Sequence, residues 1–132
     1  MRLWHIDTIP VLPKGQLLAQ WRELNSVFAK EDRHILINYI YEYPKSHLYT
    51  YTQLIVDEML ARGYNIRAFE KMTRYFEGVT LDRSIQPFPH HHDDTYFEIC
   101  YFNLKEKFLR GQKDYAETQF IALQKLYDAK KT

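Results

Sequence analysis

The sequence contains a single cysteine, Cys100, and no long uninterrupted run of apolar residues. One cysteine cannot form a disulfide within the chain, so a reducing compartment is favoured and Cys100 is expected to be a packed thiol. A membrane-spanning helix needs about 20 consecutive apolar residues, which excludes a membrane protein. The chain also begins without the charged and then apolar leader of a secreted protein. We therefore expect a cytoplasmic protein with no membrane partner.

A strong excess of positive charge is missing as well. The chain has 18 Lys and Arg against 17 Asp and Glu, which gives a net charge of +1. A domain that binds nucleic acid usually carries a clear excess of basic residues. If this chain binds DNA, its basic residues must therefore be gathered on one face.

Aromatic residues, by contrast, are abundant and make up 16% of the 132 residues. A chain of this length forms one domain with a substantial core and is too short for two. Apolar residues recur at helical spacing along most of it. We predict an all-α protein, a compact bundle of about four to five helices over residues 1–132, with an extended N-terminal arm.

The helical pattern is clearest over residues 16–28, where four apolar residues recur at i, i+4, i+7 and i+11 and form one stripe. Arg22 and Glu23 lie on opposite flanks of this stripe. From the helix alone, the pair is most simply explained as two solvated surface charges. A carboxylate on that flank can equally face a site. The stripe consists of Leu17, Trp21, Leu24 and Phe28.

The same reasoning predicts four further helices, over residues 46–62, 67–77, 96–110 and 114–129. Ser46 and Thr95 are placed to cap the first and third of these. Gly63 is placed to end the first as a left-handed residue.

The first 13 residues have apolar residues without helical spacing. Pro10 and Pro13 are expected to keep this segment extended until Pro13 opens the first helix. We predict an arm laid over the core. Residues 35–43 are β-branched and aromatic, and they fit either a short strand or a helix.

Residues 90–94 read His-His-His-Asp-Asp and raise a metal hypothesis, since imidazole and carboxylate both bind Zn²⁺. Adjacent residues in a loop rarely converge on one ion, and no second ligand pair is visible at i, i+4 spacing. A metal-dependent hydrolase that uses His90–Asp94 is kept as a third alternative. We expect no metal and no cofactor.

Two blocks of the sequence resemble the pyrimidine-dimer DNA glycosylase (endonuclease V-like) family. The first is LLAQWREL over residues 17–24, followed by Val27 and Phe28, in which an arginine and a glutamate adjoin as they do in that family. The second is EMLARGYNI over residues 58–66, which is similar to the family's Glu-Cys-Leu-Lys-Arg-Gly-Phe-Asn-Ile. The two blocks occur in the same order as in the family.

The resemblance implies a metal-independent DNA glycosylase with abasic-site lyase activity and an imine intermediate. In that family the nucleophile is the α-amine of the first residue and the glutamate is the catalytic carboxylate. These roles fall here on Met1 and Glu23, with Arg22 beside them. Met1 stands where the family has threonine. We expect Met1 to be retained because Arg2 is bulky, and the chemistry tolerates the change because the reacting group is a main-chain amine.

The resemblance also implies damaged double-stranded DNA, in particular DNA with pyrimidine dimers, as the partner of a monomer. It assigns phosphate contacts to Arg2, Arg22, Arg33 and His34, although a histidine such as His34 beside an apolar run is more often packed or capping. A basic stripe at i, i+4 and i+7 on the predicted helix 67–77 is a plausible continuation of this surface. That stripe consists of Arg67, Lys71 and Arg74.

One departure from the family keeps a rival interpretation open. Ser26 stands where the endonuclease V-like pattern has a second arginine a few residues after the Arg-Glu pair. This difference and the low net charge favour a non-catalytic helical module that binds DNA or protein with the same surface.

Overall fold

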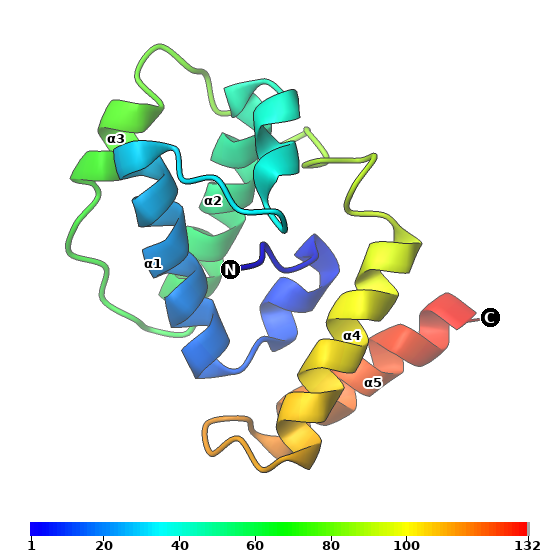
Figure 1. Ribbon diagram of the computed structural model, residues 1–132. Coiled ribbons are helices and arrows are strands. Elements are labelled where there is room, and N and C mark those ends of the chain that lie inside the picture. Colours follow the sequence, from blue (N-terminus) through cyan, green and yellow to red (C-terminus); the bar gives the residue numbers. More distant parts are fainter. Residues whose placement is uncertain (132) are drawn as a thin grey trace.

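The computed structural model describes residues 1–131, and over these residues the chain is helical and without strands (Figure 1). The predicted all-α class is confirmed. The five α-helices are α1 (Lys14–Lys30), α2 (Lys45–Ala61), α3 (Glu70–Tyr75), α4 (Asp94–Leu109) and α5 (Glu117–Lys131). Two short 3-10 helices, η1 (Ile6–Val11) and η2 (Asn38–Glu42), complete the described part.

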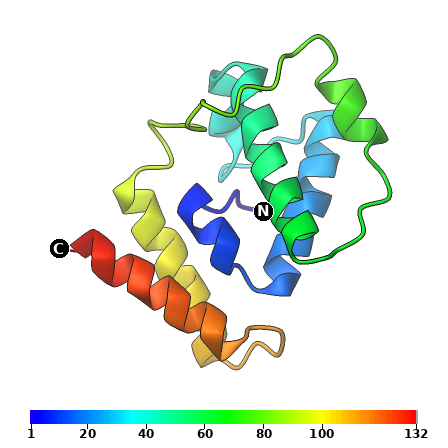
Figure 2. The ribbon, with the colours of Figure 1, turned by 180° about the vertical axis from the view of Figure 1, so that it is seen from behind.

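The N-terminal segment, residues 1–12, lies between two groups of helices (Figures 1 and 2). Helix α1 packs against α2 and α3, and α4 packs against α5, while η1 contacts α2 on one side and α4 and α5 on the other. Leu3 and Leu12 of this segment are fully buried, and Trp4 and Ile9 nearly so. The predicted arm is therefore built into the core and is not laid over it.

This segment also corrects the prediction of a continuous extended arm. Residues 6–11 form a 3-10 helix with Pro10 inside it, because the fixed backbone angle of proline suits that helix as well as an extended chain. His5 caps its start: the His5 Nδ1 accepts a hydrogen bond of 3.1 Å from the Asp7 N–H. The Thr8 N–H and hydroxyl both donate to the His5 carbonyl, at 2.9 and 2.7 Å.

Helix α1 buries the predicted stripe at Leu17, Leu24 and Phe28. Trp21 is only half-buried, and its ring meets the edge of Phe69 at a centroid distance of 5.8 Å. The apolar period thus located this helix and its inward face correctly.

The predicted helix caps are partly wrong. Helix α2 begins at Lys45 after Pro44 without a side-chain cap, and Ser46 lies inside it. Helix α4 is capped by Asp93, whose carboxylate accepts a 2.9 Å hydrogen bond from the Tyr96 N–H, so Thr95 is not its N-cap. Gly63 does end α2 with a positive φ of 81°, as predicted.

Residues 35–43 contain η2 and no strand. Helix α3 is only six residues long and begins at Glu70, so Arg67 lies before it. Phe69 is the residue directly before the helix, and its ring meets that of Trp21 edge-on at a centroid distance of 5.8 Å. The basic residues expected along one helical stripe consequently do not share one helix.

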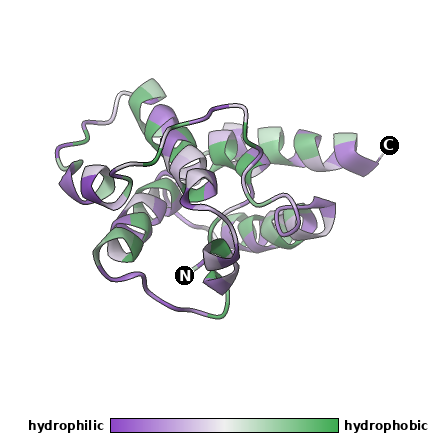
Figure 3. Ribbon diagram, turned by 90° about the horizontal axis from the view of Figure 1, so that it is seen from above, coloured by the Kyte–Doolittle hydropathy of each residue, from purple (hydrophilic) through white to green (hydrophobic). Residues whose placement is uncertain are grey.

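Hydrophobic and hydrophilic residues alternate along each long helix (Figure 3). Within residues 1–131, no helix combines the length and the apolar character needed to cross a lipid bilayer.

Candidate active site

A cavity of about 230 Å³ opens at the start of the chain. Four separate parts of the sequence meet there: the first residues, helix α1, the loop after α1 and helix α4, the last two with one residue each. The residues that line it are Met1, Arg2, Trp4, Gln16, Ala19, Glu23, Leu36 and Lys107. Of the predicted site residues, Met1, Arg2 and Glu23 are brought together in this cavity.

The backbone beside this cavity is held by side chains from two other helices. The Tyr96 hydroxyl of α4 donates a 2.6 Å hydrogen bond to the Leu3 carbonyl. The Tyr51 hydroxyl of α2 donates a 2.6 Å hydrogen bond to the Trp4 carbonyl. Because both hydroxyls are firmly packed and both bonds are short, the first residues have a fixed course past α1.

Glu23 lies half-buried on the wall that α1 contributes. Burial raises the pKa of its carboxyl above the ordinary value, because a charge is less well solvated there. Several groups act in the opposite direction: the amine of Met1, a hydrogen bond from the Arg2 backbone N–H, and the charges of Arg22 and His34. The amine and the carboxylate are therefore close enough to interact electrostatically.

Arg2 has its guanidinium turned toward aromatic rings. It lies 5.9 Å from the centre of the Trp4 ring and 5.8 Å from that of Tyr96. Contacts of this kind hold a cation in place over a π face. Arg2 thus forms a charged wall of the cavity, and Lys107 contributes a second cation from α4.

Arg22 and Lys71 are exposed and line a neighbouring pocket of about 330 Å³ between α1 and the start of α3. Arg33 stacks on the ring of Tyr41 at 3.9 Å in the loop after α1. His34 in the same loop is exposed, and its Nδ1 accepts a 3.1 Å hydrogen bond from a backbone N–H. These residues surround the cavity without lining it.

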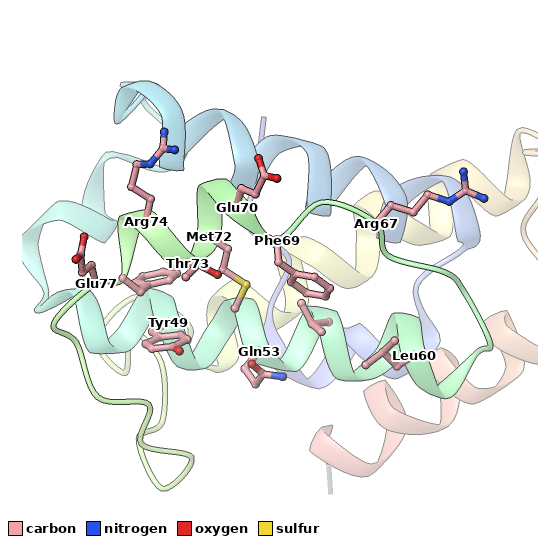
Figure 4. A pocket seen from close by; sticks show the side chains of 12 residues that line it. Tyr49, Gln53, Leu60, Arg67, Phe69, Glu70, Met72, Thr73, Arg74 and Glu77 are labelled. Atoms are coloured by element: carbon pink, nitrogen blue, oxygen red, sulfur yellow. The ribbon is translucent and has the colours of Figure 1, made fainter.

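Arg67 and Arg74 border a different hollow, the groove of about 1070 Å³ between α2 and α3 (Figure 4). Figure 4 shows the Met72 and Phe69 side chains pointing into the groove toward α2 and the two arginines directed away from it. The predicted basic stripe is therefore split between two sides of α3, with Lys71 on the side of α1.

The histidines of residues 90–94 have separate surroundings. His92 is buried, and its Nε2 is 2.6 Å from the Tyr39 hydroxyl. Its pKa is lowered to about 3, chiefly by burial. The His91 Nδ1 is 2.8 Å from the Tyr43 hydroxyl. In the described part of the chain, no group of three or more His, Cys, Asp or Glu side chains is arranged to hold a metal ion.

Two residues of this region were missed in the sequence. Gln20 is a fully buried polar side chain that bonds both the N-terminal backbone and Glu23, and its spacing of three residues from Glu23 on one helix was a usable signal. Lys107 reaches the cavity from α4 only through long-range packing, so no local pattern indicated it.

Fold and cavity together define an all-helical protein whose first residue shares a small site with a carboxylate and two cations. The chain belongs to the pyrimidine dimer DNA glycosylase family, since the model of that family matches residues 1–72, more than half of the 132 residues. The match includes the first residues, α1 and α2 and ends within α3. No curated protein and no solved structure matches the chain. The family implies DNA glycosylase activity, with DNA as the substrate.

Proposed function

We propose that the protein releases damaged bases, chiefly those in pyrimidine dimers, from duplex DNA and then cleaves the strand as an abasic-site lyase. It acts as a cytoplasmic monomer and needs no metal. The observation that carries the proposal is the lining of the small cavity, in which Met1 and Glu23 meet. An amine and a carboxylate at one site are the two groups that imine chemistry on a sugar requires.

The reaction begins when the neutral α-amine of Met1 attacks C1′ of the damaged nucleotide. A C–N bond forms, and the bond from C1′ to the base breaks, so the base leaves with the electron pair and takes up a proton. The sugar ring opens to an iminium, which makes the C2′ protons acidic. Glu23 stabilises this cation and then removes a C2′ proton, and the 3′ phosphate leaves by β-elimination. Water finally hydrolyses the imine and restores the amine.

The basic residues serve to orient the duplex. Arg2 and Lys107 line the cavity, and Arg22 and Lys71 line the pocket beside it. Cations so arranged neutralise phosphates that flank the damaged nucleotide without reading the sequence. The lesion supplies selectivity, because a damaged pair is easier to unstack than an intact one.

Arg33 and His34 extend this surface along the loop after α1, where the Arg33 guanidinium is exposed beside Tyr41. Arg67 and Arg74 lie farther out around α3 and make weaker, more screened contributions.

A non-catalytic DNA- or protein-binding module is the second candidate. The net charge of +1 and the presence of Ser26 favour it, because both reduce the positive surface available to a DNA enzyme.

Trapping with borohydride separates the two candidates. The protein is mixed with a duplex that carries one abasic site, and borohydride is added during the reaction in the presence of EDTA. The proposed enzyme yields a stable covalent protein–DNA adduct whose DNA is attached to the N-terminal peptide. A chain with a free N-terminus that binds the duplex but forms no adduct is a binding module. An adduct that forms only without EDTA points to metal chemistry.

A further inference from the structure

Gln20 is 0% exposed, and it lies on α1 three residues before Glu23. Its Oε1 accepts a hydrogen bond of 2.8 Å from the Trp4 N–H and lies 3.0 Å from the Tyr51 hydroxyl, whose single proton is donated to the Trp4 carbonyl. Its Nε2 donates to the Arg2 carbonyl at 3.0 Å and to the Glu23 Oε2 at 3.2 Å. These three bonds use both donors and one acceptor position of the amide.

The orientation of this amide follows from its partners. The Trp4 N–H can only donate, so the amide oxygen must face it. The Arg2 carbonyl accepts, as does the Glu23 carboxylate when ionised, so the NH₂ group must face them. A flipped amide would bring donor to donor and acceptor to acceptor in a fully buried place, where unpaired polar groups are costly. The side chain has one satisfactory arrangement.

This arrangement restricts the positions open to the N-terminal amine. The Arg2 carbonyl bonds Gln20, and the Arg2 backbone N–H faces the Glu23 carboxylate, so the peptide groups on both sides of the Arg2 Cα lie against α1. The Cα of Met1 lies in the first of these peptide planes. The amine is one bond away from that plane, and a single backbone torsion of Met1 decides where it points.

We propose that Gln20 is a positioning residue, which holds the N-terminal backbone and the Glu23 carboxylate at a set separation so that the Met1 amine and Glu23 act on the same sugar. This inference rests on the proposed function. Gln20 is buried and does not line the cavity, so it acts through the two groups that it joins and does not touch the substrate.

The buried amide also stabilises the ionised form of Glu23, because it donates to the carboxylate. The charged and titratable groups around Glu23 are the amine of Met1 and Arg2 from the N-terminal segment, Arg22 from its own helix, His34 from the following loop and Tyr51 from α2. Lys107 lines the same cavity from α4. Loss of the amide donor leaves these groups in place and raises the pKa of Glu23.

Three variants test the inference. Gln20→Met keeps the length of the side chain and removes its three hydrogen bonds. Gln20→Glu keeps the acceptor for the Trp4 N–H but, when ionised, loses both donated bonds and sets a second carboxylate beside Glu23. Gln119→Met is the matched control, because the Gln119 Nε2 likewise donates to a carbonyl of the N-terminal segment, that of Leu12, at 3.2 Å and away from the cavity.

The rate of imine formation on an abasic duplex is measured for each variant by single-turnover borohydride trapping between about pH 4 and 9. Gln20→Met should lower the rate by about ten- to a hundredfold, because a misplacement of about 1 Å has that effect. Its affinity for a duplex with a tetrahydrofuran analogue of the abasic site should stay within about twofold. The acid limb of the pH–rate profile for strand cleavage, where the rate falls as Glu23 is protonated, should move to higher pH in Gln20→Met. It should move farther in Gln20→Glu. Gln119→Met should lose thermal stability but keep the wild-type rate and acid limb.

Two outcomes overturn the inference in different ways. If the wild type forms imine and Gln20→Met matches it in rate and acid limb, Gln20 has no positioning role and the proposed function stands. If the wild type itself cannot be trapped, the proposed function fails and this inference fails with it. Should Gln20→Met not fold by circular dichroism, Gln20→Glu decides the question through the same rate and acid limb, because it has the same size as glutamine.

Discussion

The small N-terminal cavity and the groove between α2 and α3 differ in both size and chemistry. The groove is more than four times larger, at about 1070 Å³ against 230 Å³. Apolar side chains such as Phe69, Met72 and Leu60 point into it, and its arginines are directed away (Figure 4). The small cavity instead gathers an amine, a carboxylate and two cations from three distant parts of the chain. The small cavity is the better candidate for an active site, because polar and charged groups converge there although its volume is smaller.

The two regions also differ in how firmly they are built. Side chains from α1, α2 and α4 hold the backbone carbonyls of residues 2, 3 and 4 beside the small cavity. One wall of the groove is α3, a helix of six residues of which only Met72 is buried. A site that must keep a nucleophile in register needs the first kind of support.

Blocking the N-terminal amine should have the largest effect. Acetylation of the Met1 amine removes the nucleophile, so base release and strand cleavage should fall to the uncatalysed level. Gel electrophoresis of a labelled duplex with an abasic site or a pyrimidine dimer measures both. A chain with a C-terminal peptide tag and a free N-terminal amine serves as the control, and its rates should be unchanged. Undiminished cleavage by a fully acetylated chain would assign the nucleophile to another group.

Glu23→Gln should have the next largest effect. The amide cannot accept the C2′ proton, so the turnover number should fall by about 10²–10⁴-fold while the affinity for the tetrahydrofuran duplex changes little. Glu77→Gln is the matched change in the groove between α2 and α3, and it should leave turnover within about twofold. Equal losses in both variants would contradict the distinction between the two regions.

Loss of single cations should have smaller effects, graded by distance from the small cavity. Arg22→Ala should raise the dissociation constant for damaged duplex by about tenfold. It should also reduce the slope of the logarithm of the binding constant against the logarithm of the salt concentration by about one, which corresponds to one released counterion. Arg74→Ala, at the groove, should raise the constant by about twofold. Fluorescence anisotropy over a range of salt concentrations measures both quantities. A larger increase of the dissociation constant for Arg74→Ala than for Arg22→Ala would indicate that DNA binds at the groove.

The smallest effect should be one on stability. Burial raises the pKa of Glu23, so the folded state binds this proton more tightly than the unfolded state does. The stabilisation that this proton gives is complete below the pKa of Glu23 in the unfolded chain. It is lost as the pH rises through the raised pKa of Glu23 in the folded protein. Glu23→Gln, which we expect to be inactive, should therefore melt at a higher temperature than the wild type at pH 7, and the difference should disappear below the ordinary pKa of 4.5. Glu77→Gln, in the groove between α2 and α3, is the matched variant and is melted at the same pH values.

Features that depend on neighbours along one helix could be predicted from the sequence. The stripe with Leu17 and Leu24 located α1, and the family resemblance of Arg22 and Glu23 pointed to the region where the cavity lies. The cap of α4 was misplaced because Asp93 and Thr95 are both good capping residues, and only the backbone course decides between them.

Features that depend on distant packing could not be predicted. Pro10 fits an extended chain and a 3-10 helix equally well, so the tertiary contacts of η1 had to decide. Lys107 and Tyr96 reach the first residues from about a hundred positions away, and no spacing rule connects them. The division of the basic residues around α3 likewise depends on the start of the helix at Glu70, which leaves Arg67 outside it.

The order in which a ribosome makes this chain gives the clamped N-terminal segment a further meaning. The Leu3 carbonyl accepts its hydrogen bond from the hydroxyl of Tyr96, and the Leu12 carbonyl accepts one from the amide of Gln119. Both donors are synthesised long after their acceptors, so the first residues to emerge are among the last to form these bonds. A nascent chain that ends before α4 can already bond the Arg2 carbonyl through Gln20 but lacks the Tyr96 hydroxyl. Only a chain synthesised through Tyr96 can complete the set of hydrogen bonds that holds the carbonyls of residues 2, 3 and 4, so this part of the molecule takes its final form late in synthesis.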